Sequence, residues 1–385
     1  MDRRSFLLGT STLALSQLLF GCGGNNQRQL KVQLLKGSIP GQVVNQFHKS
    51  LQQQVQLKFA PVERIQDLFQ QLQNWQQKPK ANDEQGWSRF IPFRQGQKVP
   101  DSDLVTLGDY WLKAAIEQKL IQPLQEVQEN QLKQWSALNE RWKQLVTRNE
   151  QGNLDTQGKV WGAPYRWGST MIVYNRDKLE KLGWAPKDWS DLWRDGVHQH
   201  ISLLNQPREV IGLVLKKLGK SYNTENLDQV ADLAKELQTL NQQVKFYSSN
   251  HYLEPLIMGD TWLAVGWSSD VLQVLGRYPQ LAAVIPQSGT AIWADMWVRP
   301  AGITAGTLSD QWIDFCWQPS TAKQISALTK SNSPISTNIT ASDIQEPLWS
   351  LLESNHAVFD KSEFLLPLPP SAIKQYESLF ARMKV

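Results

Sequence analysis

Short segments with the alternation of β-strands and segments with the period of α-helices follow one another along this chain. Residues 30–35 alternate and are rich in Val and Leu, and residues 43–51 then place apolar side chains at helical spacing. The same order continues with a strand over 55–60, a helix over 63–77 and a strand over 103–107. Such alternation predicts a mostly parallel sheet covered by helices, that is, an α/β fold.

This order of segments returns later in the chain, which predicts a second α/β half. Strands are predicted over residues 170–175, 264–267 and 282–285, and helices over 177–182, 189–194, 209–218 and 227–240. A chain of 385 residues is longer than one ordinary hydrophobic core supports. Two domains, or two lobes of one fold, are therefore expected.

The first residues have the composition of an export signal. An Arg-Arg pair precedes an apolar run shorter than the roughly 20 residues needed to span a bilayer. Arg-Arg-x-Phe-Leu resembles a twin-arginine signal, and Leu-Phe-Gly-Cys, ending at Cys22, resembles a lipobox in which the cysteine becomes lipidated. We therefore predict a signal peptide over residues 1–21, a lipid anchor on Cys22 and a tether over 22–29. A generic signal peptide with an incidental cysteine is the alternative.

Charge and cysteine content narrow the function classes. The formal net charge is only +4 and the chain has no long run of like charge, which argues against a dedicated nucleic-acid binder. Two cysteines cannot build a disulfide framework. With Cys22 lipidated, Cys316 would be unpaired and is predicted to be a buried, apolar side chain.

Ligands of α/β sheets bind at the carboxyl ends of the strands. This rule places Gly37 and Ser38, after the first strand, and Asp109 and Tyr110, after the third, beside a candidate site. Asp109 is also expected to cap the following helix. The polar, aperiodic segment 79–100 is predicted to be a long loop.

Enzyme and metal motifs give little support to a catalytic function. The sequence has no Gly-x-Ser-x-Gly, phosphate-loop or His-Glu-x-x-His motif. His198 and His200 are two residues apart without a third ligand and are expected to be a surface or loop pair. No cofactor or metal is predicted. An anchored hydrolase with a carboxylate pair remains the rival from another class.

Several segments in the same order together resemble the extracellular solute-binding proteins of ABC importers, in particular the spermidine/putrescine-binding branch. They span nearly the whole chain after the signal. In chain order they are Asp103-Leu104-Val105, Ile121-Gln122-Pro123-Leu124, Trp161 to Gly168, Val173-Tyr174-Asn175, Trp189 to Trp193, Pro207 to Val210, Met258-Gly259-Asp260, Val265 to Ser268, Val284 to Thr290, Ile292 to Asp295 and Trp312 to Trp317.

The resemblance implies a type II periplasmic binding protein fold, with two α/β lobes joined by hinge crossover strands. The crossings are expected near 161–167, 290–295 and 332–340. The first lobe would contain residues 30–164 and 292–332, and the second lobe residues 165–291 and 333–385. Such a protein would be a lipid-anchored, periplasmic monomer without enzymatic activity, which closes over its ligand and docks on a membrane permease with its ATPase.

The resemblance also implies a set of ligand-binding residues. Trp267, Trp293 and Asp295 match two cleft tryptophans and an amine-binding carboxylate, and Tyr110 and Glu209 match a further aromatic and a further carboxylate. Apart from the resemblance, the residues themselves predict three neighbours of this site, namely Asp109, Asp270 and Ser38. Aromatic faces and carboxylates suit a polyamine, which is a flexible apolar rod bearing ammonium groups.

Other interpretations of these residues stay open at this point. Trp267 could be a buried strand end, and Asp295 could be a crossover carboxylate bonded to backbone. Glu209 could be an ordinary acid in the first turn of a helix, favoured by the helix dipole.

The chain also departs from the family at three places. Gln206 replaces an acidic residue, Gly37 and Ser38 replace an acidic and an aromatic residue, and Leu365 replaces a glutamine. A cleft with fewer acids suits a shorter or less charged amine, and another small solute such as a metal or an organic anion is the alternative ligand.

Overall fold

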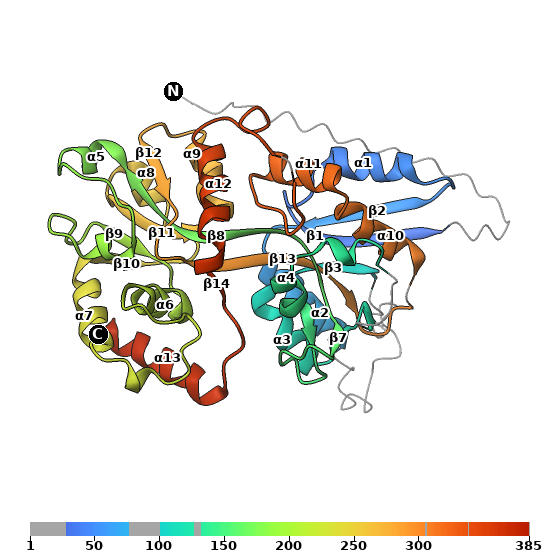
Figure 1. The fold of residues 1–385 in the computed structure, drawn as a ribbon, viewed down its shortest axis with the longest axis horizontal. Helices are drawn as coiled ribbons and strands as arrows, with labels where there is room; N and C mark the ends of the chain where they lie inside the picture. The colour runs from blue at the N-terminus through green and yellow to red at the C-terminus, as the bar shows by residue number, and fades with distance from the viewer. Residues whose placement is uncertain (1–27, 77–100, 127–131, 305, 338, 385) are drawn as a thin grey trace, which may run out of the picture.

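The computed structural model describes residues 28–76, 101–126, 132–304, 306–337 and 339–384. The predicted signal peptide, Cys22 and the predicted loop over 79–100 lie outside these ranges. Within them, no helix has both the length and the apolar character needed to cross a bilayer. The chain forms two α/β halves that lie side by side, with two long strands running from one half into the other (Figure 1).

The first half begins with the predicted order of strand and helix. Its elements are β1 (Gln29–Leu35), α1 (Gly41–Ser50), β2 (Gln56–Val62), α2 (Ile65–Gln76), β3 (Leu104–Gly108) and α3 (Asp109–Glu117). β1 pairs in parallel with both β2 and β3, as the sequence predicts. Of the predicted tether over 22–29, the structure describes only Arg28 and Gln29, and Gln29 is the first residue of β1.

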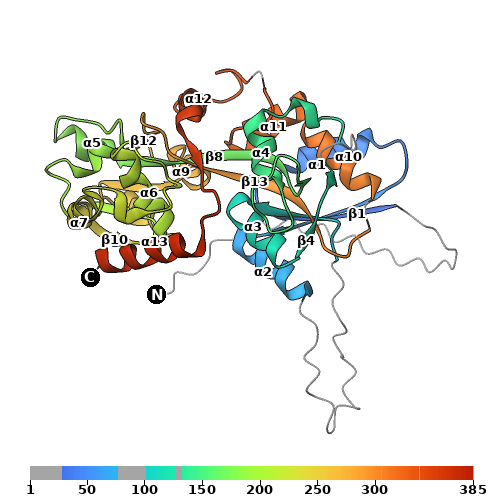
Figure 2. The same ribbon diagram turned by 60° about the horizontal axis from the view of Figure 1, so that its bottom comes forward.

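Two long strands form the centre of the sheet. β8 (Ala163–Asn175) and β13 (Ala291–Pro300) pair with each other in antiparallel orientation. The order β10-β9-β11-β8-β13-β3-β1-β2 makes one continuous sheet, and Figure 2 shows both strands passing between the halves. The sheet is therefore mixed, which corrects the prediction of a mostly parallel one. The reason is that β8 and β13 carry the chain between the halves in opposite directions.

The second half contains most of the predicted segments. Its elements are α5 (Arg176–Glu180), a 3₁₀ turn (Trp189–Trp193), β9 (Ile201–Leu203), α6 (Pro207–Lys217), α7 (Leu233–Gln243), β10 (Val244–Tyr247), α8 (Glu254–Met258), β11 (Leu263–Trp267), α9 (Ser268–Leu275) and β12 (Leu281–Val284). The helix predicted over 227–240 is interrupted, because Asp232 has a left-handed backbone with φ of 62°. Only a short 3₁₀ turn precedes it, at Leu227–Gln229.

The remaining elements cover the sheet and close the chain. They are β4 (Ile121–Gln122), β5 (Gln125–Glu126), α4 (Glu140–Val146), β6 (Thr147–Arg148), β7 (Lys159–Val160), α10 (Thr307–Cys316), α11 (Pro319–Thr329), α12 (Leu348–Val358), β14 (Glu363–Phe364) and α13 (Pro370–Met383). Cys316, at the end of α10, is buried in the core, as predicted for an unpaired thiol.

The apolar side chains divide into cores that match the two halves. One cluster is drawn from residues 30–167 and 292–335, and two others are drawn from residues 171–285 and 344–383. Phe364 is an exception, because it packs in the first cluster although it belongs to the C-terminal segment. The backbone of Asn332 exchanges two hydrogen bonds of 2.8 Å with Trp167 of β8, at the place where the third crossing is expected. The exact lobe boundaries stay a prediction.

Candidate functional site

Alternate residues of β8 form the base of the candidate site. Arg166 lies opposite Asp295 of β13, and Gly168 lies opposite Trp293. On the other side of β8, Thr170 lies opposite Trp267 at the end of β11. Because side chains two residues apart point to the same face of a strand, these residues share one face of the sheet. With Glu209 of α6 they are called the β8 site.

The absence of a side chain at Gly168 makes room for the Trp293 indole. A Cβ atom added to Gly168 would lie 2.5 Å from a ring carbon of Trp293 and 2.1 Å from the Ser268 hydroxyl. Ser268 itself accepts a hydrogen bond of 3.1 Å from the Ser169 amide. The half-buried Trp293 ring thus lies across β8 and joins the two ends of the site.

One end of the β8 site carries a carboxylate held only by uncharged groups. Glu209 is 6% exposed and accepts hydrogen bonds from the Trp267 indole at 2.9 Å and from the Thr170 hydroxyl at 3.0 Å. Burial raises the pKa of Glu209, and these two hydrogen bonds oppose the rise, as does the positive charge of Arg208 to a smaller extent. Within the described part of the chain, no ion pair to Glu209 is formed. Its neighbour Arg208 donates instead to the Leu366 carbonyl.

The other end carries an ion pair. Nε and Nη2 of Arg166 lie 2.7 Å and 2.6 Å from one carboxylate oxygen of Asp295, and both side chains are buried. Burial raises the pKa of Asp295, and Arg166 opposes that rise. Burial alone would lower the pKa of Arg166, yet the nearby Asp295 raises it, so the short contacts favour the charged pair. The partner of this carboxylate is therefore a guanidinium of the same chain.

Asp109 and Tyr110 border the Asp295 end of the site. Asp109 accepts a hydrogen bond of 3.0 Å from the Ala294 amide, and burial raises its pKa to about 7. It does not cap α3 as expected, because the N-cap is Gly108 and makes no side-chain cap. Tyr110 is 54% exposed, meets Trp111 at a right angle, and lies near enough to Arg208 to influence the pKa of that guanidinium.

Ser38 reaches the Arg166–Asp295 end of the β8 site only through Tyr165. Its side chain is fully buried, and its hydroxyl accepts a hydrogen bond of 2.9 Å from Tyr165. The Tyr165 ring stacks on Trp297 in the first core, and the pairing of β8 with β13 is irregular at this point, so that the Tyr165 hydroxyl lies near Arg166 and Asp295. The sequence argument located the end of β1 correctly but could not tell which way this small side chain turns.

Asp270, the third acid suggested by position, lies behind Trp267. Its carboxylate accepts a hydrogen bond of 2.7 Å from Tyr252, whose hydroxyl also accepts from the Trp267 amide at 3.3 Å. The Tyr252 ring meets Trp267 edge-on at a centroid distance of 6.4 Å. Asp270 thus supports the position of Trp267.

Three members of the site were not predicted from the sequence, namely Arg166, Gly168 and Thr170. All three fall in the motif from Trp161 to Gly168 or directly after it, so their positions were in view. The signal that could have found them is the two-residue period of β8, together with the unusual presence of a cation in a strand of otherwise uncharged residues.

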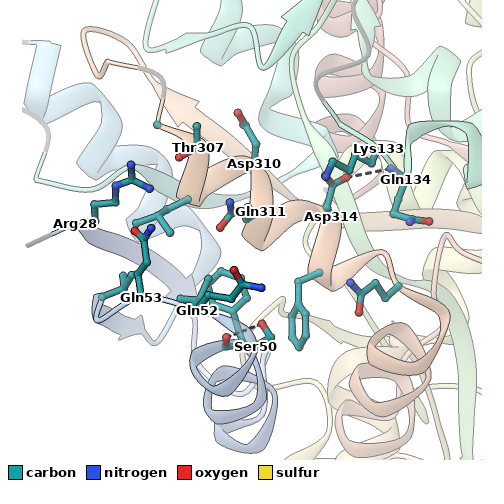
Figure 3. Close-up of a pocket in the computed structure, with 17 residues that line it drawn as sticks. Arg28, Ser50, Gln52, Gln53, Lys133, Gln134, Thr307, Asp310, Gln311 and Asp314 are labelled. Atoms are coloured by element: carbon teal, nitrogen blue, oxygen red, sulfur yellow. Dashed lines mark hydrogen bonds between the residues drawn. The ribbon is translucent and has the colours of Figure 1, made fainter.

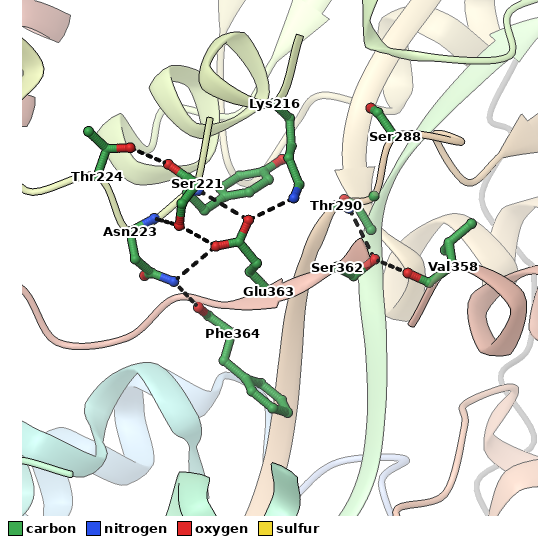
Figure 4. Close-up of polar contacts among 12 residues, drawn as sticks. Lys216, Ser221, Asn223, Thr224, Ser288, Thr290, Val358, Ser362, Glu363 and Phe364 are labelled. Atoms are coloured by element: carbon green, nitrogen blue, oxygen red, sulfur yellow. Dashed lines mark hydrogen bonds and ion pairs between the residues drawn. The ribbon is translucent and has the colours of Figure 1, made fainter. Parts of the chain in front are cut away.

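A carboxylate near this region shows how the chain satisfies an acid internally. Glu363 of β14 forms an ion pair of 2.7 Å with Lys216 and also accepts from Ser221 and Asn223 (Figure 4). Ser362 beside it accepts a hydrogen bond of 3.1 Å from the Thr290 amide. Glu363 is thus neutralised by the protein, unlike Glu209.

A hollow of about 860 Å³ lies away from the β8 site, between the end of α1 and α10. Arg28, Gln53, Thr307 and Asp310 are among the side chains that surround it (Figure 3). None of the predicted site residues lines it. We place the candidate site at β8 because charge, burial and aromatic faces converge there.

The described residues offer no cluster of three or more His, Cys, Asp and Glu side chains that could hold a metal ion. His200 stacks on Trp262 at a centroid distance of 3.8 Å, and His198 is exposed. The two histidines therefore do not form a shared site.

Comparison with known proteins identifies relatives of the chain. It is 29% identical over 192 residues to the putrescine/cadaverine-binding protein of Pseudomonas aeruginosa, which covers 46% of this chain and 53% of that protein. It is 28% identical over 239 residues to the putrescine-binding periplasmic protein PotF of Escherichia coli, covering 58% and 62%. The aligned regions thus span between half and two thirds of these curated relatives.

Solved structures show the same fold over almost the whole chain. The spermidine/putrescine ABC transporter substrate-binding protein PotD of Streptococcus pneumoniae superposes with a TM-score of 0.74 at 18% identity, covering 93% of this chain and 99% of that one. A periplasmic thiamin-binding protein gives a TM-score of 0.55 at 14% identity. These likenesses confirm the predicted type II periplasmic binding protein fold.

The family model for bacterial extracellular solute-binding proteins matches residues 101–349. This range contains β8, β11 and β13, which carry every residue of the β8 site except Glu209, and α6, which carries Glu209. The chain therefore belongs to the bacterial extracellular solute-binding protein family.

Proposed function

We propose that this protein is the substrate-binding component of an ABC importer and captures a small amine of the polyamine class at the β8 site. Glu209 carries the proposal, because it is a buried carboxylate beside a half-buried indole and is held only by neutral donors. A buried charge is costly unless an opposite charge meets it. An ammonium group over the Trp267 face would supply that charge.

The names of the relatives support an amine as the ligand. Putrescine, cadaverine or spermidine appears in the names of the curated proteins that match this chain. All are solute-binding proteins, which supports a protein that carries out no chemistry of its own. We propose that ligand binding brings the two lobes together and that the closed form delivers the amine to a membrane permease.

We further propose that the protein works as a monomer in the periplasm, anchored to the membrane through a lipidated Cys22. The lipobox-like sequence before Cys22 supports the anchor, and the periplasmic location of named relatives supports the compartment. The modest net charge of +4 supports a small ligand rather than a nucleic acid.

The first test measures amine binding by the protein and by Glu209→Gln. Wild type is titrated calorimetrically with 1,4-diaminobutane, N-acetyl-1,4-diaminobutane and spermidine, and at least one should bind with micromolar affinity. Glu209→Gln should weaken binding of the best ligand by roughly tenfold to a hundredfold, because a charge-assisted hydrogen bond contributes about 1.5–3 kcal/mol.

A second glutamate serves as the control that separates the loss of a ligand contact from the loss of an acid in the first turn of a helix. Glu254 also lies in the first turn of a helix, but its side chain is exposed. Glu254→Gln should leave amine affinity unchanged within about twofold. If Glu209→Gln binds as well as Glu254→Gln, Glu209 is only a first-turn acid, and if none of the amines binds, the proposed ligand class is wrong.

A further inference from the structure

The two ends of the β8 site differ in net charge. Glu209, beside Trp267, forms no ion pair with any described residue, and Arg208 is the smallest of the influences on it, so no contacting cation neutralises the carboxylate at this end. At the other end the charge of Asp295 is matched by Arg166, which lies 2.6 Å away. Arg166 and Thr170 are four residues apart on one strand, so the ends are separated by roughly 13 Å along β8.

Trp293 connects these ends on the shared face of the sheet. Its ring lies over Gly168, midway between Arg166 and Thr170, and the Arg166 guanidinium carbon is 5.7 Å from the ring centroid. An apolar linker of a ligand lying along β8 would therefore run over Trp293 between the two ends.

From this geometry we infer that Arg166 takes, from within the chain, the place on Asp295 that a second ligand amine would occupy, and that the site therefore selects amines with a single positive charge. This inference rests on the proposed amine-binding function. It assigns the ligand one ammonium group at Glu209 and an uncharged hydrogen-bonding group, such as an amide or a hydroxyl, at the Arg166–Asp295 end.

The reason is the balance of charge at that end. A second ammonium group would have to leave water and lie beside a guanidinium that already neutralises the carboxylate. The free-energy cost of its desolvation would then not be offset by attraction to a net negative charge. An amide has no such cost. Its oxygen can accept from the guanidinium, which carries five N–H donors, and its N–H can donate to a carboxylate oxygen.

Asp109 works against this contrast, because a second carboxyl near Asp295 favours a cation there. Its carboxyl lies near Asp295, but it accepts from the Ala294 amide and is also influenced by Arg148, a buried cation behind it. The effect of Asp109 is limited, because this acid is already hydrogen-bonded to backbone and is influenced by a cation of its own.

The test compares three ligands that share a four-carbon spacing. They are 1,4-diaminobutane with two charges, N-acetyl-1,4-diaminobutane with one charge, and 4-aminobutanoate, which is a zwitterion. Calorimetric titration of the wild type should show N-acetyl-1,4-diaminobutane binding at least tenfold more tightly than the other two. Arg166→Gln should reverse this preference, with a gain of tenfold or more for 1,4-diaminobutane, because Asp295 then lacks a cation.

Two further variants control for charge and for burial. Arg166→Lys keeps the positive charge and should keep the wild-type order of ligands. The buried Arg299 forms an ion pair of 2.8 Å with the partly buried Asp310, away from the β8 site, so Arg299→Gln should disturb packing without changing the order of ligands.

Arg166→Gln leaves a buried carboxylate unpaired, so its melting temperature is measured with and without 1,4-diaminobutane. The diamine should raise the melting temperature of Arg166→Gln by several degrees more than that of the wild type, which is a readout even for a weakly folded variant. The double variant Arg166→Gln/Asp295→Asn should lose this extra rise.

The outcomes separate this inference from the proposed function. The selection for singly charged amines is overturned if the wild type binds 1,4-diaminobutane as tightly as its acetylated form, or if it binds 4-aminobutanoate most tightly. In the first of these cases the transport proposal in its broad form still stands. If Arg166→Gln shows no gain for the diamine, Arg166 does not set selectivity. If no amine binds at all, the proposed function itself fails.

Discussion

At the residue scale, Asp109 is the acid of this region whose charge changes closest to neutral pH. Burial raises the pKa of its carboxyl to about 7, and the Ala294 amide, which donates to it, opposes the rise. In an unfolded chain the pKa of an aspartate is about 3.9. Between about pH 4 and pH 7 the folded protein therefore binds more protons than the unfolded chain at this residue, and its contribution to stability is lost as the pH rises through that range.

We predict that Asp109→Asn removes this loss of stability. The free energies of unfolding of the variant and the wild type should be similar at pH 5, and at pH 8 the variant should be more stable by roughly 1–3 kcal/mol. Each unit of pKa shift corresponds to about 1.36 kcal/mol of stability, and partial exposure of the Asp109 side chain reduces the expected stability difference. Urea denaturation at both pH values measures the difference. Asp177→Asn, at an exposed first-turn acid of α5, is the control. If the variant and the wild type differed in unfolding free energy by the same amount at pH 5 and at pH 8, the raised pKa of Asp109 would be contradicted.

The sequence predicted which residue types meet at the site but not how their charges pair. Trp267, Trp293 and Asp295 do come together beside β8, because motif order reflects the topology of the family. That Arg166 lies opposite Asp295 depends on strand register, and register is not determined by residue types within one strand. The burial of Ser38 likewise depends on Tyr165, which is 127 positions away along the chain.

At the element scale, β8 determines the geometry of the site, and Gly168 is its most constrained position. Gly168→Ala would place a methyl group 2.5 Å from the Trp293 ring and 2.1 Å from the Ser268 hydroxyl, so both side chains must move. We predict that the variant loses about 1–3 kcal/mol of unfolding free energy, as is typical of overpacking, and binds the preferred amine at least tenfold more weakly. Urea denaturation and calorimetric titration give the two values.

The matched control for this substitution is Gly276→Ala. Gly276 follows α9 with an ordinary helical backbone, and an added Cβ atom would have no heavy atom within 4 Å. Stability and affinity should both stay within experimental error of the wild type. An unchanged affinity for Gly168→Ala would mean that the position of Trp293 is not important for binding.

Most elements could be predicted from periodicity because their apolar faces are clear. β1, α1, β2, α2 and β3 all lie within a few residues of their predicted ranges. The errors occurred where local backbone geometry decides the outcome. The left-handed residue Asp232 interrupts the helix predicted over 227–240, so that α7 begins only at Leu233. The segment Trp189–Trp193 forms a 3₁₀ turn, which begins with a capping box between Asp188 and Asp191.

At the scale of the whole molecule, the two halves are joined through their backbones as well as their side chains. β8 and β13 are shared by a single sheet, and the chain crosses again near Asn332. The alternation of strands and helices predicted two α/β halves but could not predict that the shared strands run antiparallel. Pairing between segments over a hundred residues apart is decided by tertiary packing.

Asn332 ties this third crossing to α12. Its side-chain amide donates to the Leu352 carbonyl at 3.0 Å, and its side-chain oxygen accepts from Asn355 at 2.9 Å, in a buried setting. Asn355 in turn accepts a hydrogen bond from Ser169 of β8. One asparagine therefore links the crossing segment, α12 and β8.

We predict that Asn332→Ala lowers the free energy of unfolding by about 2–4 kcal/mol. The substitution leaves the Asn355 amide unpaired in the interior, which costs about 1–3 kcal/mol. It also removes the second hydrogen bond to the Leu352 carbonyl, which still accepts within α12, at a cost of about 1 kcal/mol. Urea denaturation measures the change against Asn153→Ala, since Asn153 also makes a side-chain hydrogen bond, to Lys113 at 2.8 Å, but is exposed. Because a bond at the surface exchanges freely with water, Asn153→Ala should cost less than about 1 kcal/mol. Equal unfolding midpoints for the two variants would show that the third crossing is held by the backbone bridge between Asn332 and Trp167 alone.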